Sequence, residues 1–539
     1  MDIHMEEMED YKRRDLAGPR EESRREEVPL PGGEAGPAGA SRTESGAGPA
    51  TSGSLPILDS PESLDALDRR LVQVRPSARQ LRHQQMEFYG FIHFTVNTFT
   101  DREWGDGTES PEIFHPSRLD ARQWVAVAKD AGMRGLILTC KHHDGFCLWP
   151  SRYTRHSVAA SPYRDGRGDV VREVSEACKE AGLAFGVYLS PWDRNHPSYG
   201  SGKEYDDYFV NQLTELLEGY GDIFAVWFDG ACGEGKNGRK QVYDWKRYYD
   251  TVRHLQPMAC ISVCGPDVRW CGNEAGRTRP SEWSVVPARA ADTEKIAENS
   301  QQADETSFRQ REITASDLDL GSRQVLWDEQ DLIWYPAEVN TSIRPGWFYH
   351  AWEDEKVKSL EELVHVYEHS VGGNATFLLN IAPDREGLVG PADVARLHEL
   401  GEYLRQTYRV NLVEQAALTC DTCLEGYVIE NVRRDTYAAC FRTADGVRES
   451  RITLTWKEPV RASRLVLKEN LLLGQRVERF AVDAWVDGDF RQIAEGTVIG
   501  YRKNVDLGKV ETDRLRIRIL DARIAPTLAF LGVYGEWRS

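Results

Sequence analysis

Two carboxylates, Asp229 and Glu274, have residue types and positions that could support acid–base or nucleophilic chemistry in this chain. Asp229 directly follows the apolar run IFAVWF (223–228), where an unpaired charge would cost on the order of several kcal/mol. Such an aspartate either caps a helix or takes part in chemistry. Glu274 lies in GPDVRWCGNEAG (265–276), after the next apolar run. One ionised and one protonated carboxyl group can together cleave a glycosidic bond.

Histidine, aromatic and charged residues follow other apolar runs in the same way. In a parallel barrel the carboxyl ends of the strands meet at one face, so these side chains are expected to form one polar and aromatic funnel. Taken singly, each could instead cap a helix or serve as a hydrogen-bonded structural residue. The residues are His93, His142, His143, Tyr188, Asp267, Arg269, Trp270, Arg344, Trp347 and His350, and Trp227 shares a strand face with Asp229.

The sequence argues against a metal ion or a cofactor. His142 and His143 are adjacent, and if the strand continues through them they point to opposite faces and cannot easily share one ion. The chain contains no HExxH motif, no glycine-rich phosphate loop after the first apolar run and no GxSxG motif. We therefore expect no metal, no cofactor and no serine nucleophile.

The elements that must position these residues repeat along the chain. A short apolar run is followed by a polar loop and then by an amphipathic pattern that often ends in glycine, which predicts strand-then-helix units in a parallel, buried sheet. The predicted strands cover 86–95, 134–142, 183–190, 223–230 and 259–265, and the predicted helices cover 120–132, 169–182, 204–221 and 244–257.

Later candidates bring the number of strands near eight. They are strands at 324–328, 347–350 and 375–383 and helices at 359–373 and 391–406. The pattern predicts an α/β fold, a (β/α)8 TIM-like barrel over 56–409, with an open doubly wound sheet as the alternative. Short strands without a convincing helix predict a β-sandwich over 410–539. The Gly/Ala/Pro/Ser-rich residues 1–55 are predicted to be a disordered tail.

Composition limits the partners. A net charge of −19 disfavours nucleic acid and anionic membranes, and 15 Trp and 21 Tyr suit the flat faces of sugars. No apolar run is long enough to span a membrane, and the charged start lacks the core of a secretion signal. Cys420 and Cys423 form a lone CxxC, which we interpret as reduced thiols. A cytoplasmic location follows as the default, with export left open.

Five motifs, in order, resemble glycoside hydrolase family 29, the α-L-fucosidases, and in particular the subgroup that acts on α-1,3 and α-1,4 branches. The resemblance covers roughly residues 80–410. The motifs are HFTVNTFTDREWGDG (93–107), KHHDGFCLWPS (141–151), GVYLSPWDRN (186–195), VWFDGACG (226–233) and GPDVRWCGNEAG (265–276).

The resemblance implies a retaining exo-enzyme in which Asp229 is the nucleophile and Glu274 the acid/base, with Glu282 as the competing acid/base. It implies that the hydroxyls of L-fucose are held by His93, His142 and His143, and that the pocket aromatics are Trp104, Tyr188, Trp227 and Trp347. Trp347 and Phe348 are candidates for an apolar wall beside the methyl group of fucose. The C-terminal part is similar to the galactose-binding-like sandwich that follows the barrel in such enzymes.

Two alternatives stay open on the residues alone. A non-catalytic barrel could bind sugar, although a lectin has no need of both Asp229 and Glu274. A retaining glycosidase could instead accept β-D-galactosides or β-D-fucosides, whose hydroxyls partly overlay those of α-L-fucose. The expected partner is a fucosylated oligosaccharide, and the sequence fixes neither the preferred oligosaccharide nor the oligomeric state.

Overall fold

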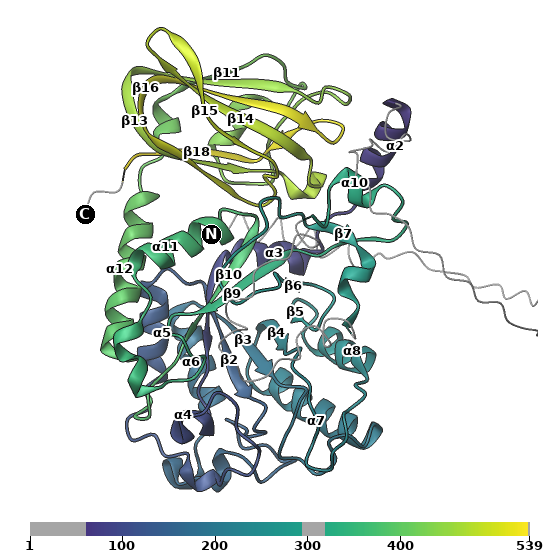
Figure 1. Ribbon diagram of the computed structural model, residues 1–539, viewed down its shortest axis with the longest axis vertical. Coiled ribbons are helices and arrows are strands. Elements are labelled where there is room, and N and C mark those ends of the chain that lie inside the picture. Colours follow the sequence, from purple (N-terminus) through teal and green to yellow (C-terminus); the bar gives the residue numbers. More distant parts are fainter. Residues whose placement is uncertain (1–60, 294–318, 537–539) are drawn as a thin grey trace, which may run out of the picture. The chain divides into compact units, whose positions relative to one another are not determined.

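A computed structural model describes residues 61–293 and 319–536 of the chain (Figure 1). The predicted tail at 1–55 lies outside the described residues. The chain divides after Ala66 into two units, of which the second, Leu67–Ser539, contains nearly all the described residues, and helix α2 (Pro61–Leu71) spans the boundary. The barrel and the C-terminal strands both belong to the second unit, Leu67–Ser539.

Eight parallel strands form a nearly closed barrel, in the order β5-β4-β3-β2-β1-β10-β9-β6. A parallel backbone bridge between Ser262 and Val268 joins β5 to the chain just before β6. This arrangement confirms the predicted TIM-like barrel and not the open sheet. The strands are β1 (Phe88–Ile92), β2 (Gly135–Lys141), β3 (Ala184–Leu189), β4 (Ile223–Phe228), β5 (Cys260–Val263), β6 (Arg269–Trp270), β9 (Ala337–Ser342) and β10 (Ala375–Ile381).

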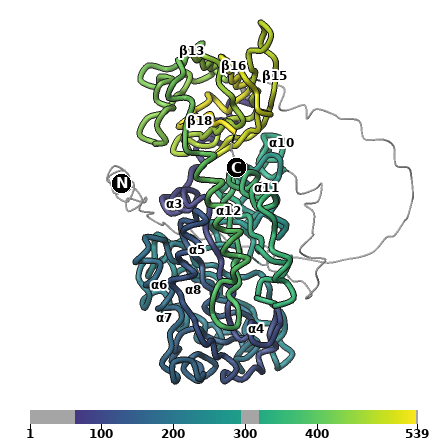
Figure 2. Tube along the Cα trace, turned by 90° about the vertical axis from the view of Figure 1, so that its left-hand side faces the viewer, coloured from purple at the N-terminus to yellow at the C-terminus, as the bar shows by residue number. Residues whose placement is uncertain are grey.

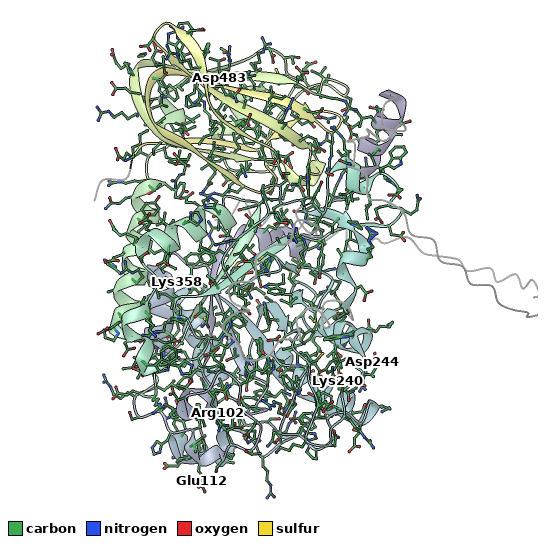
Figure 3. All side chains as sticks on the ribbon, in the orientation of Figure 1. Arg102, Glu112, Lys240, Asp244, Lys358 and Asp483 are labelled. Atoms are coloured by element: carbon green, nitrogen blue, oxygen red, sulfur yellow. The ribbon has the colours of Figure 1, made fainter. Side chains whose placement is uncertain are left out.

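Three of the helices that follow the strands begin at an aspartate cap. The Asp120, Asp169 and Asp244 carboxylates each accept a hydrogen bond from a backbone N–H of the first turn, which satisfies donors that a helix start leaves open. Figure 3 labels Asp244.

In Figure 1 the helices that follow the barrel strands lie outside those strands. They are α5 (Ala121–Asp130), α6 (Val170–Ala181), α7 (Lys203–Gly219), α8 (Trp245–Leu255), α11 (Leu360–Ser370) and α12 (Pro391–Thr407).

Two predicted strands are wrong. Residues 324–328 mostly form the short helix α10 (Arg323–Leu326), which the Ser322 side chain caps, and residues 347–350 form no strand. The barrel uses β6 and β9 instead. β9 was missed because its sequence, AEVNTS, is polar although all six residues are buried. Those polar groups face partners inside the barrel, so they do not follow the apolar pattern expected of a buried strand.

The C-terminal residues form antiparallel sheets, which agrees with the predicted β-sandwich. The long strands β13 (Ser450–Lys468) and β16 (Lys503–Ala522) run side by side (Figure 2). The pairing of β13 with β16 has a register shift between Thr455 and Val460. The other strands are β11 (Ala417–Cys420), β12 (Phe441–Arg442), β14 (Val477–Val486), β15 (Asp489–Gly496), β17 (Thr527–Leu528) and β18 (Phe530–Tyr534).

Side chains of the sandwich separate by face. Apolar residues of β14 and β16, such as Phe480, Val482 and Ile517, are fully buried in its core. On the other face of β14, the Asp483 carboxylate accepts hydrogen bonds from Arg516 and Arg518 at 2.7 and 2.8 Å; Figure 3 labels Asp483. This alternation is the period-2 pattern of a strand with one face in a core.

Two further expectations concern the redox state of the cysteines and the presence of a membrane-spanning helix. All ten cysteines are free thiols, including Cys420 and Cys423, as the CxxC interpretation expected. Within 61–293 and 319–536, no helix is both long and apolar enough to cross a membrane.

Candidate active site

The carboxyl ends of the barrel strands surround a pocket with about 730 Å³ of empty space, which includes its open mouth. Of the nine predicted site residues, eight line this pocket, and the ninth, Tyr188, reaches it through its hydroxyl group. The lining residues are mostly aromatic or polar: Phe91, His93, Glu103, Trp104, His142, His143, Trp227, Asp229, Gly230, Ala231, Val263, Trp270, Glu274, Asn340 and Trp347.

Asp229 directly follows β4 and is held by two donors. The Tyr188 hydroxyl donates to Oδ2 at 2.9 Å, and the backbone N–H of Ala231 donates to Oδ1 at 2.8 Å. The side chain is 22% exposed, and it lines the pocket. Asp229 does not cap the next helix, α8, because Asp244 does so. The two bonds therefore orient an accessible carboxylate at the pocket wall.

Glu274 lies in the loop after β6 and lines the same pocket. The indole Nε1–H of Trp347 donates to its Oε2 at 3.2 Å. The competing Glu282 is buried in an ion pair with Arg269, accepts a hydrogen bond from the Arg279 backbone at 3.1 Å, and does not line the pocket. Of the two glutamates, Glu274 alone stands where it can meet a ligand in this pocket.

Three charged residues expected in the funnel are not in it. Asp267 pairs with Arg79 and Arg253, Arg269 pairs with Glu282, and Arg344 pairs with Asp393 and Asp354. Each is buried and none lines the pocket. A buried charge is tolerated when it is paired, and each of these three residues has such a partner, 10 to 188 residues away in the sequence. Position at a strand end was therefore not enough to place these side chains in the pocket.

His93 presents a neutral ring whose tautomer is set by its neighbours. The Asn380 amide nitrogen donates to the Trp347 carbonyl at 2.8 Å, so the Asn380 amide oxygen is the atom that faces His93. His93 Nδ1 must therefore carry the proton in this 2.8 Å bond, and Nε2 keeps its lone pair. Burial lowers the pKa of His93 to about 4. Near neutral pH, Nε2 can accept a hydrogen bond from a ligand hydroxyl.

Both His142 and His143 line the pocket, because the strand does not continue through them, which was the condition for their pointing to opposite faces. The strand β2 ends at Lys141, and the turn that follows brings the two ring centroids within 4.1 Å. Burial lowers the pKa of His142 well below its ordinary value and that of His143 to about 4. Among the residues that the structure describes, no cluster of three or more His, Cys, Asp or Glu side chains could hold a metal ion.

The His143 tautomer also follows from its contacts. The Ser190 hydroxyl donates to the Trp192 carbonyl at 2.7 Å, so it accepts the 2.7 Å bond from His143 Nδ1–H. Nε2 of the neutral ring is therefore an acceptor, and it lies 3.7 Å from Asp229 Oδ2. Two acceptors side by side favour a donor group between them, such as a sugar hydroxyl.

Aromatic rings form the apolar part of the pocket. Trp227 stacks on Tyr188 with ring centroids 5.3 Å apart, and Trp104 meets His143 edge-on at 5.4 Å. Trp347 lines the pocket, but Phe348 does not: it is fully buried and packs its ring against His93 and His142. Of the two candidates for an apolar wall, only Trp347 is available to a ligand.

Glu103 lines the pocket and was missed from the sequence. Its carboxylate accepts bonds from the backbone N–H groups of Trp347 and Phe348 at 2.9 and 3.2 Å and from His350 Nε2 at 2.9 Å. His350, expected in the funnel, instead joins Glu103 to Asp101, whose carboxylate lies 2.7 Å from Nδ1. A carboxylate directly before the predicted Trp104 was the only available signal.

The Asp101–His350–Glu103 clamp gives a pH prediction. The bond to Glu103, together with Asp101, raises the pKa of His350 to about 9 from 6.5. Because the folded pKa is higher, the stabilisation by this group is full below about pH 6.5, falls as the pH rises and is lost above about pH 9. The difference in thermal unfolding midpoint between the wild type and His350→Gln should therefore shrink from pH 6 to about pH 9. A difference that stays constant over this range would contradict the clamp.

A (β/α)8 barrel with two carboxylates in a pocket of histidine and aromatic side chains, at the carboxyl ends of its strands, defines the class of glycoside hydrolases. The sequence profile of the alpha-L-fucosidase family matches residues 75–408. The chain belongs to this family, glycoside hydrolase family 29, and is an α-L-fucosidase. The sugar-binding barrel and the β-D-glycoside alternatives are thereby set aside.

Relatives of the chain agree with this assignment. Alpha-L-fucosidase 1 of Arabidopsis thaliana is 38% identical over 468 residues, which cover 85% of this chain and 87% of the plant protein. A family 29 member from an unknown rumen bacterium has a similar structure, with a TM-score of 0.71 and 38% identity, and 86% and 78% of the two chains covered. A Ruminococcus gnavus family 29 fucosidase, solved in complex with fucose, matches with a TM-score of 0.75 and 29% identity. The match covers 86% of this chain and 95% of the bacterial chain.

Proposed function

We propose that the enzyme is a retaining exo-α-L-fucosidase in which Asp229 is the nucleophile and Glu274 the acid/base. The observation that carries the proposal is that both carboxyl groups line one pocket while different partners hold them, Tyr188 and Ala231 for Asp229 and Trp347 for Glu274. Retaining glycosidases need two carboxyl groups about 5 to 5.5 Å apart, one to attack and one to transfer a proton.

In the first step, an oxygen of Asp229 bonds to the anomeric carbon while the bond from that carbon to the leaving oxygen breaks. Glu274 gives its proton to the leaving oxygen, so the aglycone departs as a neutral alcohol. In the second step Glu274 takes a proton from water, the water oxygen bonds to the anomeric carbon, and Asp229 leaves. Two inversions give L-fucose with its configuration retained.

Neutral histidines suit the binding of a neutral sugar. The Nε2 atoms of His93 and His143 can accept hydrogen bonds from fucose hydroxyls, and the Glu103 carboxylate offers a further acceptor in the same pocket. Trp227 and Trp347 offer apolar faces for the ring and its methyl group. The fucose bound to the Ruminococcus gnavus relative supports L-fucose as the sugar in this pocket.

We further propose α-1,3 and α-1,4 branches as the substrates, because the acid/base position in GNEAG (272–276) matches the subgroup that cleaves them. Release of L-fucose from an α-1,3-branched, an α-1,4-branched and an α-1,2-linked oligosaccharide, measured side by side, tests this. We expect release from the two branched substrates only, and none by the Asp229→Ala variant. Equal release from the α-1,2-linked substrate would disprove the linkage preference but leave the retaining reaction standing.

A further inference from the structure

A buried acid, Glu338, lies inside the barrel beneath the pocket. It sits on β9, has no exposed surface, and is not among the lining residues. Burying a carboxyl group is costly, and an apolar residue of similar size would fill the same space. Glu338 is also one of the residues that make β9 polar and hid it from sequence analysis. It therefore calls for an explanation beyond packing.

The two oxygens of Glu338 accept bonds from two other barrel strands. The indole Nε1–H of Trp227, on β4, donates to Oε1 at 2.8 Å. The hydroxyl of Tyr89, on β1, donates to Oε2, and this hydroxyl also meets His83 Nε2 at 3.0 Å and Thr376 Oγ1 at 3.1 Å. One carboxyl group thus fixes two aromatic side chains that enter the barrel from different strands.

Trp227 connects Glu338 to the reacting groups. Its ring lines the pocket and stacks on Tyr188 with an interplanar angle of 25°, and the Tyr188 hydroxyl donates to Asp229 Oδ2 at 2.9 Å. An indole can donate from only one atom, so the bond to Glu338 sets the rotation of the ring within an otherwise apolar contact. A rotation of Trp227 would change both the pocket wall and the face on which Tyr188 rests.

We propose that Glu338 is a positioning residue, which holds the Trp227 ring as a wall of the sugar pocket and as the support of the Tyr188–Asp229 bond. The part that concerns Asp229 rests on its proposed role as nucleophile. Burial raises the pKa of Glu338 to about 7. A neutral group of the same shape that keeps an acceptor oxygen toward Trp227 should therefore serve nearly as well.

Two substitutions at this position separate positioning from packing. Glu338→Leu keeps the bulk but removes both acceptors, whereas Glu338→Gln keeps an acceptor for the indole. We expect Glu338→Leu to lower kcat/KM on 4-nitrophenyl α-L-fucoside about 10- to 100-fold, because a small shift of Trp227 would misplace groups in the site. It should also weaken L-fucose binding, measured by calorimetry. Glu338→Gln should restore both values toward wild type.

Thr376→Val is the matched core control. It removes another hydroxyl that touches Tyr89, with no bond to Glu338 or Trp227. We expect it to lower the unfolding midpoint without changing kcat/KM or L-fucose affinity. If the folded Glu338→Leu protein has wild-type kcat/KM and L-fucose affinity, or if Thr376→Val impairs both as strongly, the proposal is overturned.

Trp227→Phe removes the same bond from the other side, and it serves if Glu338→Leu does not fold. It should lower kcat/KM and weaken L-fucose binding by itself. Where Glu338→Leu does fold, adding it to Trp227→Phe should cause little further loss, because coupled residues are not additive. Wild-type behaviour of Trp227→Phe, or fully additive losses, would refute positioning through this bond. If Asp229→Ala stays active, the nucleophile assignment fails, yet the L-fucose affinity still tests Glu338, since the Trp227 wall does not depend on which carboxyl group attacks.

Discussion

Replacement of Asp229 by alanine is expected to abolish turnover of 4-nitrophenyl α-L-fucoside, with kcat lowered by about 10⁴- to 10⁶-fold, as when a covalent nucleophile is removed. The loss should be in kcat because Asp229 forms its bond only as the reaction proceeds. Azide should restore part of the turnover of this variant, since a small anion can occupy the space left by the carboxylate and attack the anomeric carbon. The product should then be β-L-fucosyl azide, detected by NMR.

Two further measurements test Asp229 as the nucleophile: the anomeric configuration of the azide product and the binding of L-fucose by the variant. A β-product requires azide to attack the anomeric carbon directly, on the face opposite the leaving group. This is the face from which Asp229 is proposed to attack. The variant should still bind L-fucose, because His93, His143 and the pocket aromatics stay in place. Full activity in the Asp229→Ala protein, or azide rescue to an α-product, would rule out Asp229 as the nucleophile.

The barrel could be predicted from the sequence where each strand is apolar on both sides. The segments at β1 to β5 and β10 show this, as do the helices whose aspartate caps can be read locally. β9 could not be found in this way, since Glu338 and Asn340 are buried by partners on other strands and are polar in sequence. Burial of a polar group depends on tertiary partners, which no local pattern contains.

The same distinction between local pattern and tertiary partners applies to the site residues. Asp229, His93 and the adjacent histidines could be placed at the mouth because each directly follows a strand. Glu103 could not, because its contacts with Trp347 and Phe348 join segments 244 and 245 residues apart. Asp267, Arg269 and Arg344 also lie near strand ends, but buried ion pairs occupy them, and such pairs depend on the tertiary arrangement, which no local pattern contains.

Replacement of Glu274 by alanine is expected to lower kcat/KM by an amount that depends on how much the leaving group needs a proton. The aglycone of a natural oligosaccharide must be protonated as it leaves, so the variant should lose about 10²- to 10⁴-fold in kcat/KM on such a substrate. The 2,4-dinitrophenolate of 2,4-dinitrophenyl α-L-fucoside leaves without a proton, so the loss on that substrate should be far smaller. Glu282→Ala is the matched control. Because it strips a buried partner from Arg269, it should lower the unfolding midpoint and impair both substrates alike. If Glu274→Ala impaired both substrates equally while Glu282→Ala discriminated between them, the acid/base would be Glu282, and the pocket wall at Trp347 would hold a carboxylate that serves binding alone.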